Sequence, residues 1–444
     1  MSQPERQIAI GVSMLGCGTV GSEVVRLITA SAKDLRQRVG GSLYIQKVAV
    51  LSIADQPDVP GLDRAVLTED VMEAAAEGEI VVELLGGIEP ARTAILAALR
   101  RGASVVTANK ALLASHGPEL YEAAEQAGVD LYYEAAVGGA IPILRPIRES
   151  LAGDTITRIL GIVNGTTNYV LDRMTLEGLE FDDVVRQAQA LGYAEADPTA
   201  DVEGYDAASK AAILASLAFH TRVSLADVYR EGITKINATD VAAAAASGHV
   251  IKLLAIVERH RDEAGQDLGV IARVHPALVP LEHPLASVHG AFNAIYVEAE
   301  AAGELMFYGR GAGGRPTSSA VVGDVVTAAR HKVFGGRGPG ESSYLALGTL
   351  PVAQAQTRYQ IRLVVRDQPG VLAKVAQEFA AEGVSIETVR QTAIKPGQPG
   401  AATLANLAVV THRAAEGALA AVVQKLAGLD VVDRVDGVLR VEGE

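Results

Sequence analysis

Short apolar segments alternate with helical patterns along the first third of the chain. Residues 8–15 form a mostly apolar run that predicts a buried strand, and Val20, Val24, Leu27 and Ile28 then recur at helical spacing. Further patterns predict strands over 45–53, 80–85, 104–107 and 131–134 and a helix over 92–101. This alternation predicts a doubly wound α/β domain over residues 1–142, which we expect a returning segment at about 310–345 to complete.

A different pattern begins at residue 143. A strand over 157–163, a polar turn over 164–168 and long Ala-rich helices predict an α+β domain over 143–334. A Gly-rich loop over 309–319 leads into a helix that we expect to begin at Val321. Gly, Ser and Pro residues gather over 335–357 and indicate a linker.

Residues 358–444 have the pattern of a compact unit of their own. Strands are expected over 359–366, 386–391, 402–410 and 431–441, with helices over 371–382 and 414–426, so the order is βαββαβ. This segment, with its strand, turn and helix around Arg366-Asp-Gln-Pro-Gly-Val-Leu372, resembles an ACT domain, a module that senses small molecules.

The resemblance to ACT domains implies that the unit pairs with a copy of itself and holds an amino acid where the turn meets the helix. Asp367 can accept from an ammonium group, and the backbone N–H groups after Gly370 can bind a carboxylate. The candidate effector residues are Asp367, Gly370, Val371 and Leu372. The alternative is a domain that serves only in dimerisation and binds no effector.

Composition excludes several classes of partner. The net charge is -14, the aromatic content is 4% and Trp is absent, which argues against a nucleic-acid binder. No apolar run reaches the roughly 18 residues that a membrane span needs, so we expect no membrane partner. The single cysteine, Cys17, and a polar start without the layout of a signal peptide favour a cytoplasmic protein.

Three glycines follow the first predicted strand in the motif Gly16-x-Gly18-x-x-Gly21. In a Rossmann-like fold the first glycine makes the tight turn, the second lets a pyrophosphate approach and the third permits close helix–strand packing. Thr19 and Val20 then lie at the helix N-terminus, which binds anions. We therefore expect a dinucleotide here, although a purely structural turn is the alternative.

Two further segments are candidates for the cofactor and substrate site. Lys110 directly follows the strand predicted over 104–107, and open α/β sheets bind ligands at the carboxyl ends of their strands. A solvated loop lysine is the alternative. Gly311 belongs to the Gly-rich loop, which we expect to form another wall of the cofactor site.

An acidic segment from Glu195 to Lys210 holds five carboxylates and one basic side chain. Such a density of negative charge implies a cationic partner, either a ligand ammonium group or a metal. A helix is expected from Gly204 on, which places Asp206 and Lys210 one turn apart on one face as an acid and a candidate proton carrier. A solvated acidic loop that leads into a surface helix is the alternative.

Several motifs occur together in this chain. They are Gly16-x-Gly18-x-x-Gly21, Ala108-Asn-Lys110, Glu134-Ala-Ala-Val137-Gly-Gly, Gly161-Ile-Val-Asn164-Gly-Thr166-Thr-Asn168-Tyr and Leu191-Gly-Tyr-Ala-Glu195-Ala-Asp-Pro, with Asp206 and Lys210. In this combination the chain resembles the homoserine dehydrogenase family over essentially its whole length. The resemblance implies reversible reduction of L-aspartate 4-semialdehyde to L-homoserine, in threonine and methionine biosynthesis, with NAD or NADP.

The resemblance also assigns roles to residues. It implies Lys210 as the catalytic lysine, Lys110 as a second functional lysine and Asp206 as a helper. The implied substrate-binding residues are Glu195, Asp201, Thr166 and Tyr193, and the implied monovalent cation, such as Na⁺, lies at Glu134, Val137, Gly139 and Ile141. The resemblance assigns catalysis and dimerisation to the α+β domain over 143–334, and it also implies a homo-oligomer, dimer or tetramer, with threonine as effector.

The residues themselves agree with this chemistry. Homoserine is a zwitterion, so its ammonium group needs the carboxylates of Glu195 and Asp201. A lysine can remove the hydroxyl proton if burial or neighbouring positive charge favours its neutral form, and Lys110 is the candidate neighbour of Lys210. The choice between NAD and NADP stays open, with a lean toward NAD or dual use, because Leu51 and Ser52 offer neither a cation nor an acid to the ribose.

Other functions remain as alternatives. Another amino-acid dehydrogenase could use the same scaffold. A divalent metal could bind Glu195, Asp197, Asp201 and Asp206, but their spacing matches no recognised all-oxygen loop. A non-catalytic sensor of amino acids and redox state is the third alternative, for which the Asp206–Lys210 pair is unnecessary.

Overall fold

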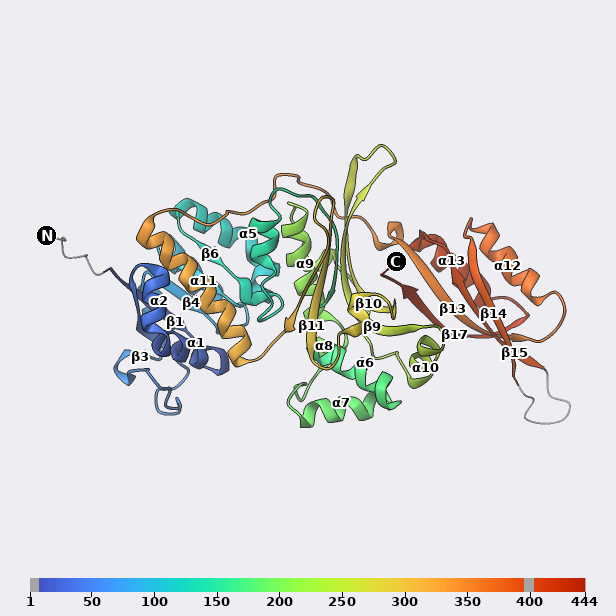
Figure 1. Cartoon of the computed structure of the whole chain (residues 1–444), viewed down its shortest axis with the longest axis horizontal. Coiled ribbons are helices and arrows are strands. Elements are labelled where there is room, and N and C mark those ends of the chain that lie inside the picture. Colours follow the sequence, from blue (N-terminus) through green and yellow to red (C-terminus); the bar gives the residue numbers. More distant parts are fainter. Residues whose placement is uncertain (1–7, 395–402, 444) are drawn as a thin grey trace.

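The computed structural model describes residues 8–394 and 403–443. Three parts lie in a row, with the N-terminal sheet at one end, a mixed region in the middle and the C-terminal strands at the other end (Figure 1). The first sheet, as far as it is described, is parallel with six strands in the order β3-β2-β1-β4-β5-β6. Its strands are β1 Ala9–Leu15, β2 Ser42–Ala49, β3 Leu67–Thr68, β4 Ile80–Glu83, β5 Ser104–Thr107 and β6 Leu131–Tyr132.

The second strand lies earlier than the apolar pattern predicted. Its first residues are only partly buried, so the segment over 42–44 carries a weak apolar signal, while the exposed Leu51 extended the predicted strand past its end at Ala49. A strand over 45–53 is therefore wrong at both ends.

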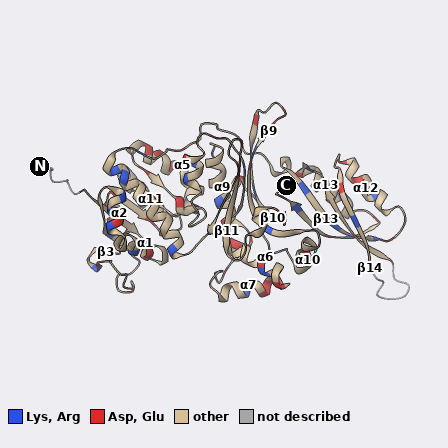
Figure 2. Cartoon of the chain, viewed as in Figure 1, with Lys and Arg blue, Asp and Glu red and all other residues tan. Residues whose placement is uncertain are grey.

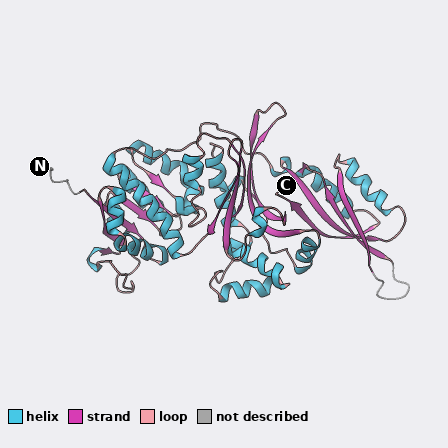
Figure 3. Cartoon of the chain, in the orientation of Figure 1, coloured by secondary structure: helices cyan, strands magenta, loops and turns pink. Residues whose placement is uncertain are grey.

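Helices cover both faces of the first sheet (Figure 3). They are α1 Thr19–Ala30, α2 Ala32–Val39, α3 Val71–Ala76, α4 Ala91–Arg100, α5 Lys110–Ala127 and α11 Gly314–Phe334. The last of these returns from much later in the chain, packs along α1 and buries Val321 and Val325 in the same core as Val24. The expected start of α11 at Val321 is wrong, because Pro316 is well suited to the first turn of a helix and α11 already begins at Gly314.

The middle part contributes strands to a second sheet. These are β7 Ile156–Ile162, β8 Tyr229–Arg230, β9 His249–Arg261, β10 Asp267–Pro280, β11 Phe292–Ala299 and β12 Gly303–Arg310. Its helices are α6 Gly165–Glu177, α7 Phe181–Ala190, α8 Thr199–Val202, α9 Tyr205–Ala218 and α10 Ala238–Ala246. The predicted polar turn over 164–168 is wrong: Asn164 caps α6 by accepting the N–H of Thr167 at 2.9 Å, so these polar residues start a helix.

The C-terminal part has the predicted βαββαβ order. Its elements are β13 Gln356–Arg366, α12 Val371–Ala381, β14 Ile386–Ile394, β15 Leu404–Thr411, the short β16 Ala414–Ala415, α13 Glu416–Ala427 and β17 Val432–Val441. Ala402, with which the third strand was expected to begin, lies outside the described residues.

The sheets of the middle and C-terminal parts are continuous. Along the described chain the order is β12-β11-β7-β9-β10-β17-β13-β15-β14, with β8 beside β10 and β16 beside β13. The junction is a parallel pairing in which Ala277 lies opposite Arg440 and Leu278 opposite Val441. The C-terminal unit therefore shares one sheet with the middle part. The sequence pattern did not predict this shared sheet.

The segment before β13 is attached to the rest of the molecule. The N–H of Gly338 donates to Asp130 at 2.7 Å, Glu341 pairs with Arg222 at 2.6 Å and the Thr221 hydroxyl donates to the Leu347 carbonyl at 2.7 Å. Figure 1 shows this segment crossing from α11 to β13. The stretch predicted as a linker is therefore a strap fixed at several points.

The distribution of charged residues and the helices of the structure add little to the classes of partner that composition excludes. Positions of both charge signs are interspersed over all three parts (Figure 2). Within residues 8–394 and 403–443, no helix has the length and apolar character required to cross a membrane.

Candidate active site

A buried lysine–aspartate pair lies on the first turns of α9. Lys210 Nζ is 2.6 Å from Asp206 Oδ2 and donates to the carbonyl oxygen of Val163 at 2.6 Å. The two side chains are only 10% and 11% exposed. The one-turn spacing predicted from the sequence thus forms, and it directs the Lys210 ammonium group to the end of β7.

A second lysine reaches the same carboxylate. Lys110 begins α5 immediately after β5, where Asn109 caps the helix by accepting the N–H of Leu112 at 3.1 Å. Lys110 Nζ lies 3.1 Å from Asp206 Oδ1. The sequence suggested a direct influence of Lys110 on Lys210, but each ammonium group pairs with its own oxygen of Asp206, which lies between them.

The surroundings of Asp206 keep it ionised. Burial alone would raise the pKa of this carboxyl group, but Lys210, Lys110 and Asn164 hold the pKa well below its usual value. Asp206 is therefore a fixed negative charge at neutral pH, suited to holding the two lysines and not to transferring a proton itself.

Asn164 is a site residue that sequence reasoning treated only as part of a motif. Its side-chain amide donates to Asp201 Oδ1 at 2.7 Å and to Asp206 Oδ2 at 3.0 Å. One side chain thus caps α6 and connects the carboxylates of α8 and α9. An asparagine directly after a strand and before a helix was the available signal.

The other predicted substrate residues form a neighbouring group. The Thr166 hydroxyl donates to the carbonyl of Tyr193 at 2.7 Å, and the Tyr193 ring packs on Tyr169 with centroids 5.0 Å apart. The Gln189 amide holds the backbone carbonyl of Glu195 at 3.0 Å. The exposed Glu195 carboxylate itself has no hydrogen-bond or ion-pair partner in the described part of the chain.

The glycine loop after β1 has the geometry of a dinucleotide site. Gly16 has a φ of +103°, and a Cβ at Gly21 would lie 2.5 Å from the Gly16 carbonyl, so neither tolerates a side chain. A Cβ at Gly18 would meet nothing within 4 Å, which leaves the face open to a ligand. No side chain among the described residues caps α1, so the N–H groups that begin at Thr19 and Val20 are available to an anion.

The loop before α11 joins this site. A Cβ at Gly314 would lie 2.9 Å from the carbonyl of Thr19, and a Cβ at Gly139 would lie 2.3 Å from that of Gly311. The Gly311 loop therefore contacts both the start of α1 and the turn that contains Gly139.

The residues expected around a monovalent cation form a tight turn. Gly138 and Gly139 have φ values of +77° and +57°. The Glu134 carboxylate accepts the N–H groups that follow this turn, at 2.6 Å from Ile143 and 2.8 Å from Leu144. Glu134, Val137, Gly139 and Ile141 can thus offer backbone carbonyl oxygens, the donor type that hard cations prefer. In the described part of the chain, no three His, Cys, Asp or Glu residues are grouped to hold a metal ion.

The expected effector residues lie at the far end of the molecule. Asp367 Oδ1 accepts from the Gln391 side chain at 3.1 Å, and Gly370, with a φ of +88°, precedes α12. Val371 is buried, whereas Leu372 is exposed. The structure does not bring these residues near Lys210.

A parallel sheet with an open glycine loop, together with a buried Lys–Asp pair that a lysine after β5 contacts, is typical of a nicotinamide-dependent dehydrogenase. The family models "Homoserine dehydrogenase, NAD binding domain", "Homoserine dehydrogenase" and "ACT domain" match residues 16–134, 142–326 and 359–430.

Known homoserine dehydrogenases match this chain over almost its full length. The homoserine dehydrogenase of Mycobacterium tuberculosis is 56% identical over 99% of both chains, and that of Corynebacterium glutamicum is 54% identical over 98% of this chain and 96% of its own. A crystal structure of a homoserine dehydrogenase from Thiobacillus denitrificans matches with a TM-score of 0.89 at 37% identity, covering 98% of this chain and 99% of that one. The chain therefore belongs to the homoserine dehydrogenase family.

The activity follows from the family and the fold. The protein is an NAD(P)-dependent oxidoreductase that interconverts L-aspartate 4-semialdehyde and L-homoserine, a step of threonine and methionine biosynthesis. The sensor alternative is not favoured.

Proposed function

We propose that Lys210 carries the proton in this reaction and that Asp206 and Lys110 position it. The observation that carries the proposal is the buried Lys210 ammonium group, held at 2.6 Å by both Asp206 and the Val163 carbonyl. In the oxidation direction the neutral Lys210 amine accepts the hydroxyl proton of homoserine as C4 loses its hydride, which forms the ammonium group that Asp206 and the Val163 carbonyl hold. In the reduction direction it returns the proton to the aldehyde oxygen. The bound nicotinamide supplies the hydride chemistry.

The substrate is held by its zwitterionic end in this proposal. Glu195 and Asp201 pair with the ammonium group, while Thr166 and Tyr193 shape the neighbouring wall. The exposed and unpaired Glu195 carboxylate supports this role, because a free carboxylate gains most from a charge-assisted hydrogen bond. Asn164 fixes Asp201 at 2.7 Å and keeps it near Asp206.

The cofactor in the proposal binds across the glycine loop, with Gly16, Gly18, Thr19, Val20, Gly21 and Lys110 on one side and Gly311 on the other. Leu51 lies fully exposed just after β2 and offers no cation to a 2′-phosphate, which favours NAD or dual use. A solved archaeal relative, 27% identical over 72% of this chain and with a TM-score of 0.61, is a mutant in complex with NADPH.

A monovalent cation such as Na⁺ belongs to the proposed site. Backbone carbonyls of Glu134, Val137, Gly139 and Ile141 would hold it. The Glu134 carboxylate is already bound to backbone N–H groups, which leaves carbonyl oxygens as the donors. The close approach of Gly139 to Gly311 supports a role for the ion in ordering the cofactor wall.

Threonine is the proposed effector, bound at the turn from Asp367 to Leu372 in a homo-oligomer, either a dimer or a tetramer. Among the described residues β14 is an edge strand that is exposed along most of its length, and an unpaired edge suits pairing with a second copy. A cytoplasmic location completes the proposal, because the one cysteine, Cys17, is buried and cannot form an internal disulfide.

A steady-state assay tests the proposed function. Purified protein is given homoserine with NAD or NADP, with and without threonine and with K⁺ replacing Na⁺, and nicotinamide absorbance is followed. We expect homoserine-dependent reduction of a cofactor that Lys210→Ala nearly abolishes. A Lys210→Ala variant that keeps more than about a tenth of the parent rate contradicts the assignment of the proton carrier.

A further inference from the structure

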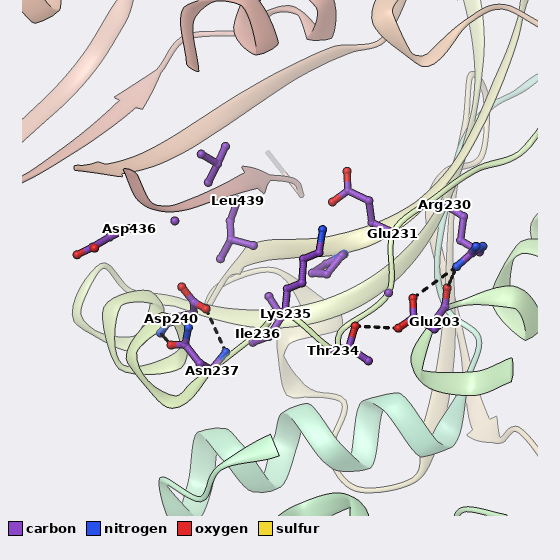
Figure 4. A pocket seen from close by; sticks show the side chains of 14 residues that line it. Glu203, Arg230, Glu231, Thr234, Lys235, Ile236, Asn237, Asp240, Asp436 and Leu439 are labelled. Carbon is purple, nitrogen blue, oxygen red and sulfur yellow. Dashed lines mark hydrogen bonds and ion pairs between the residues drawn. The ribbon is translucent and has the colours of Figure 1, made fainter. Parts of the chain in front are cut away.

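A cavity of about 440 Å³ lies between the middle and C-terminal parts, away from the glycine loop. Its walls come from the segment that follows β8, from the start of α10 and from the 436–439 segment of β17 (Figure 4). Cavities of about 300–1,000 Å³ accept small molecules. The lining thus comes from two parts of the chain, the middle part, which contains the catalytic domain, and the C-terminal part, which contains the ACT domain.

Several charged groups of the lining already have partners. Asp240 forms an ion pair with Arg362 of β13, Glu231 is 2.8 Å from Arg440 of β17, and Asp436 pairs with Arg434 at 2.7 Å. The first two pairs hold the two parts together, and all three leave little net charge for a ligand.

Two charged groups of the lining remain available. Lys235 is exposed and has no hydrogen-bond or ion-pair partner within residues 8–394 and 403–443. Its side chain extends toward the space between Glu231 and Leu439 (Figure 4). Glu203 accepts the Thr234 hydroxyl at 2.8 Å but lies 3.8 Å from Arg230, which is too long for a strong pair. A free cation and a loosely paired carboxylate that line one cavity, together with the apolar surface of Leu439, complement a zwitterion with an aliphatic side chain.

The cavity wall is also joined to the active-site segment. The N–H of Ile233 donates to the carbonyl of Val202 at 2.8 Å, and a Cβ at Gly232 would lie 2.4 Å from that same carbonyl. The Arg230 guanidinium donates to the Glu203 carbonyl and lies 3.5 Å from the centre of the Tyr205 ring. The backbone that carries the cavity wall therefore cannot shift without moving the turn between α8 and α9.

That turn separates two residues of the proposed active site. Asp201 belongs to α8 and Asp206 to the first turn of α9, so a displacement at Glu203 changes the position of one carboxylate relative to the other. Asn164, which connects the two, would lose one of its hydrogen bonds.

We propose that this cavity binds a free α-amino acid, with its carboxylate on Lys235 and its ammonium group on Glu203, and that its occupancy changes the affinity for homoserine. The site is distinct from the turn at Asp367. The effect on homoserine rests on the proposed function, whereas the binding itself does not.

The test titrates the full-length protein with each of the twenty L-amino acids by calorimetry, without substrate. We expect at least one to bind the parent, and Lys235→Ala to weaken that binding about 10- to 150-fold, as expected for loss of a charge-assisted contact. Lys235→Arg retains the charge and most of the affinity. Lys425→Ala, which removes an exposed lysine of α13, serves as the matched control and keeps parental binding.

A kinetic arm measures coupling. The amino acid that binds should change the KM for homoserine of the parent roughly 5- to 150-fold, but not that of Lys235→Ala. The proposal is overturned if no amino acid binds the parent, or if binding survives Lys235→Ala and is lost in Asp367→Ala, which assigns the ligand to the C-terminal turn. Lys235-dependent binding without any turnover of homoserine would refute the proposed function and leave this site standing.

Discussion

Replacing Lys210 by alanine removes the ammonium group that Asp206 and the Val163 carbonyl hold at 2.6 Å. Turnover should fall by about 100- to 10,000-fold in both directions, because a positioned acid–base group contributes a factor of this size. The substitution also breaks a buried ion pair, which costs about 3–5 kcal/mol when one partner is lost. Asp206 keeps Lys110 at 3.1 Å and Asn164 at 3.0 Å, so the cost should lie near the lower limit.

Lys210→Arg separates the two effects. Arginine keeps the positive charge beside Asp206 but stays protonated, so it restores most of the stability and none of the proton transfer. Steady-state rates with homoserine and with the semialdehyde, together with thermal unfolding of the parent and both variants, make the comparison. Near-parental rates in Lys210→Arg would refute the proton-carrier role, and equal stability of Lys210→Ala and the parent would refute the importance of the buried pair.

Three other substitutions test separate parts of the molecule. Glu195→Gln should raise the KM for homoserine about 10- to 150-fold with a smaller change in kcat, and an unchanged KM would place Glu195 outside the substrate site. Leu51→Arg should raise the ratio of kcat/KM for NADP to that for NAD, measured against Leu51→Gln as an uncharged control; a constant ratio would mean that this exposed position does not lie beside the ribose. Glu442→Gln should lower the free energy of unfolding by about 3 kcal/mol at pH 7. Burial alone would raise the pKa of the Glu442 carboxyl group, but Arg273 and Arg158 lower it to about 2, against 4.5 in the unfolded chain. Since the pKa is lowered, this stability is present above pH 4.5 and is lost as the pH falls toward 2; urea unfolding that gives the same deficit at pH 7 and pH 3 would contradict it.

The continuous sheet affects how the C-terminal part can be studied. Glu442, just beyond β17, pairs with Arg273 of β10 at 3.1 Å, and both side chains are almost completely buried. Removing the C-terminal part would leave the edge of β10 open and Arg273 without this partner. Point substitutions in the full-length chain are therefore the sounder test of regulation.

Local patterns in the sequence predicted the features that depend on neighbouring residues. The steric limit between Gly21 and the Gly16 carbonyl operates within six residues, and Asp206 and Lys210 meet because a helix places them one turn apart. The alternation of strands and helices predicted the parallel sheet and the βαββαβ order.

Only the tertiary structure decided which distant segments meet. Asn164 reaches Asp201 and Asp206, Lys110 arrives at Asp206 from another domain, and β17 extends the sheet of the middle part at β10. None of these contacts has a periodic signal in the sequence, because each depends on how elements about forty or more residues apart pack, and packing depends on the combined shape and burial of many side chains. The sequence by itself thus determined most of the elements and the chemical groups, and the three-dimensional packing determined their distances.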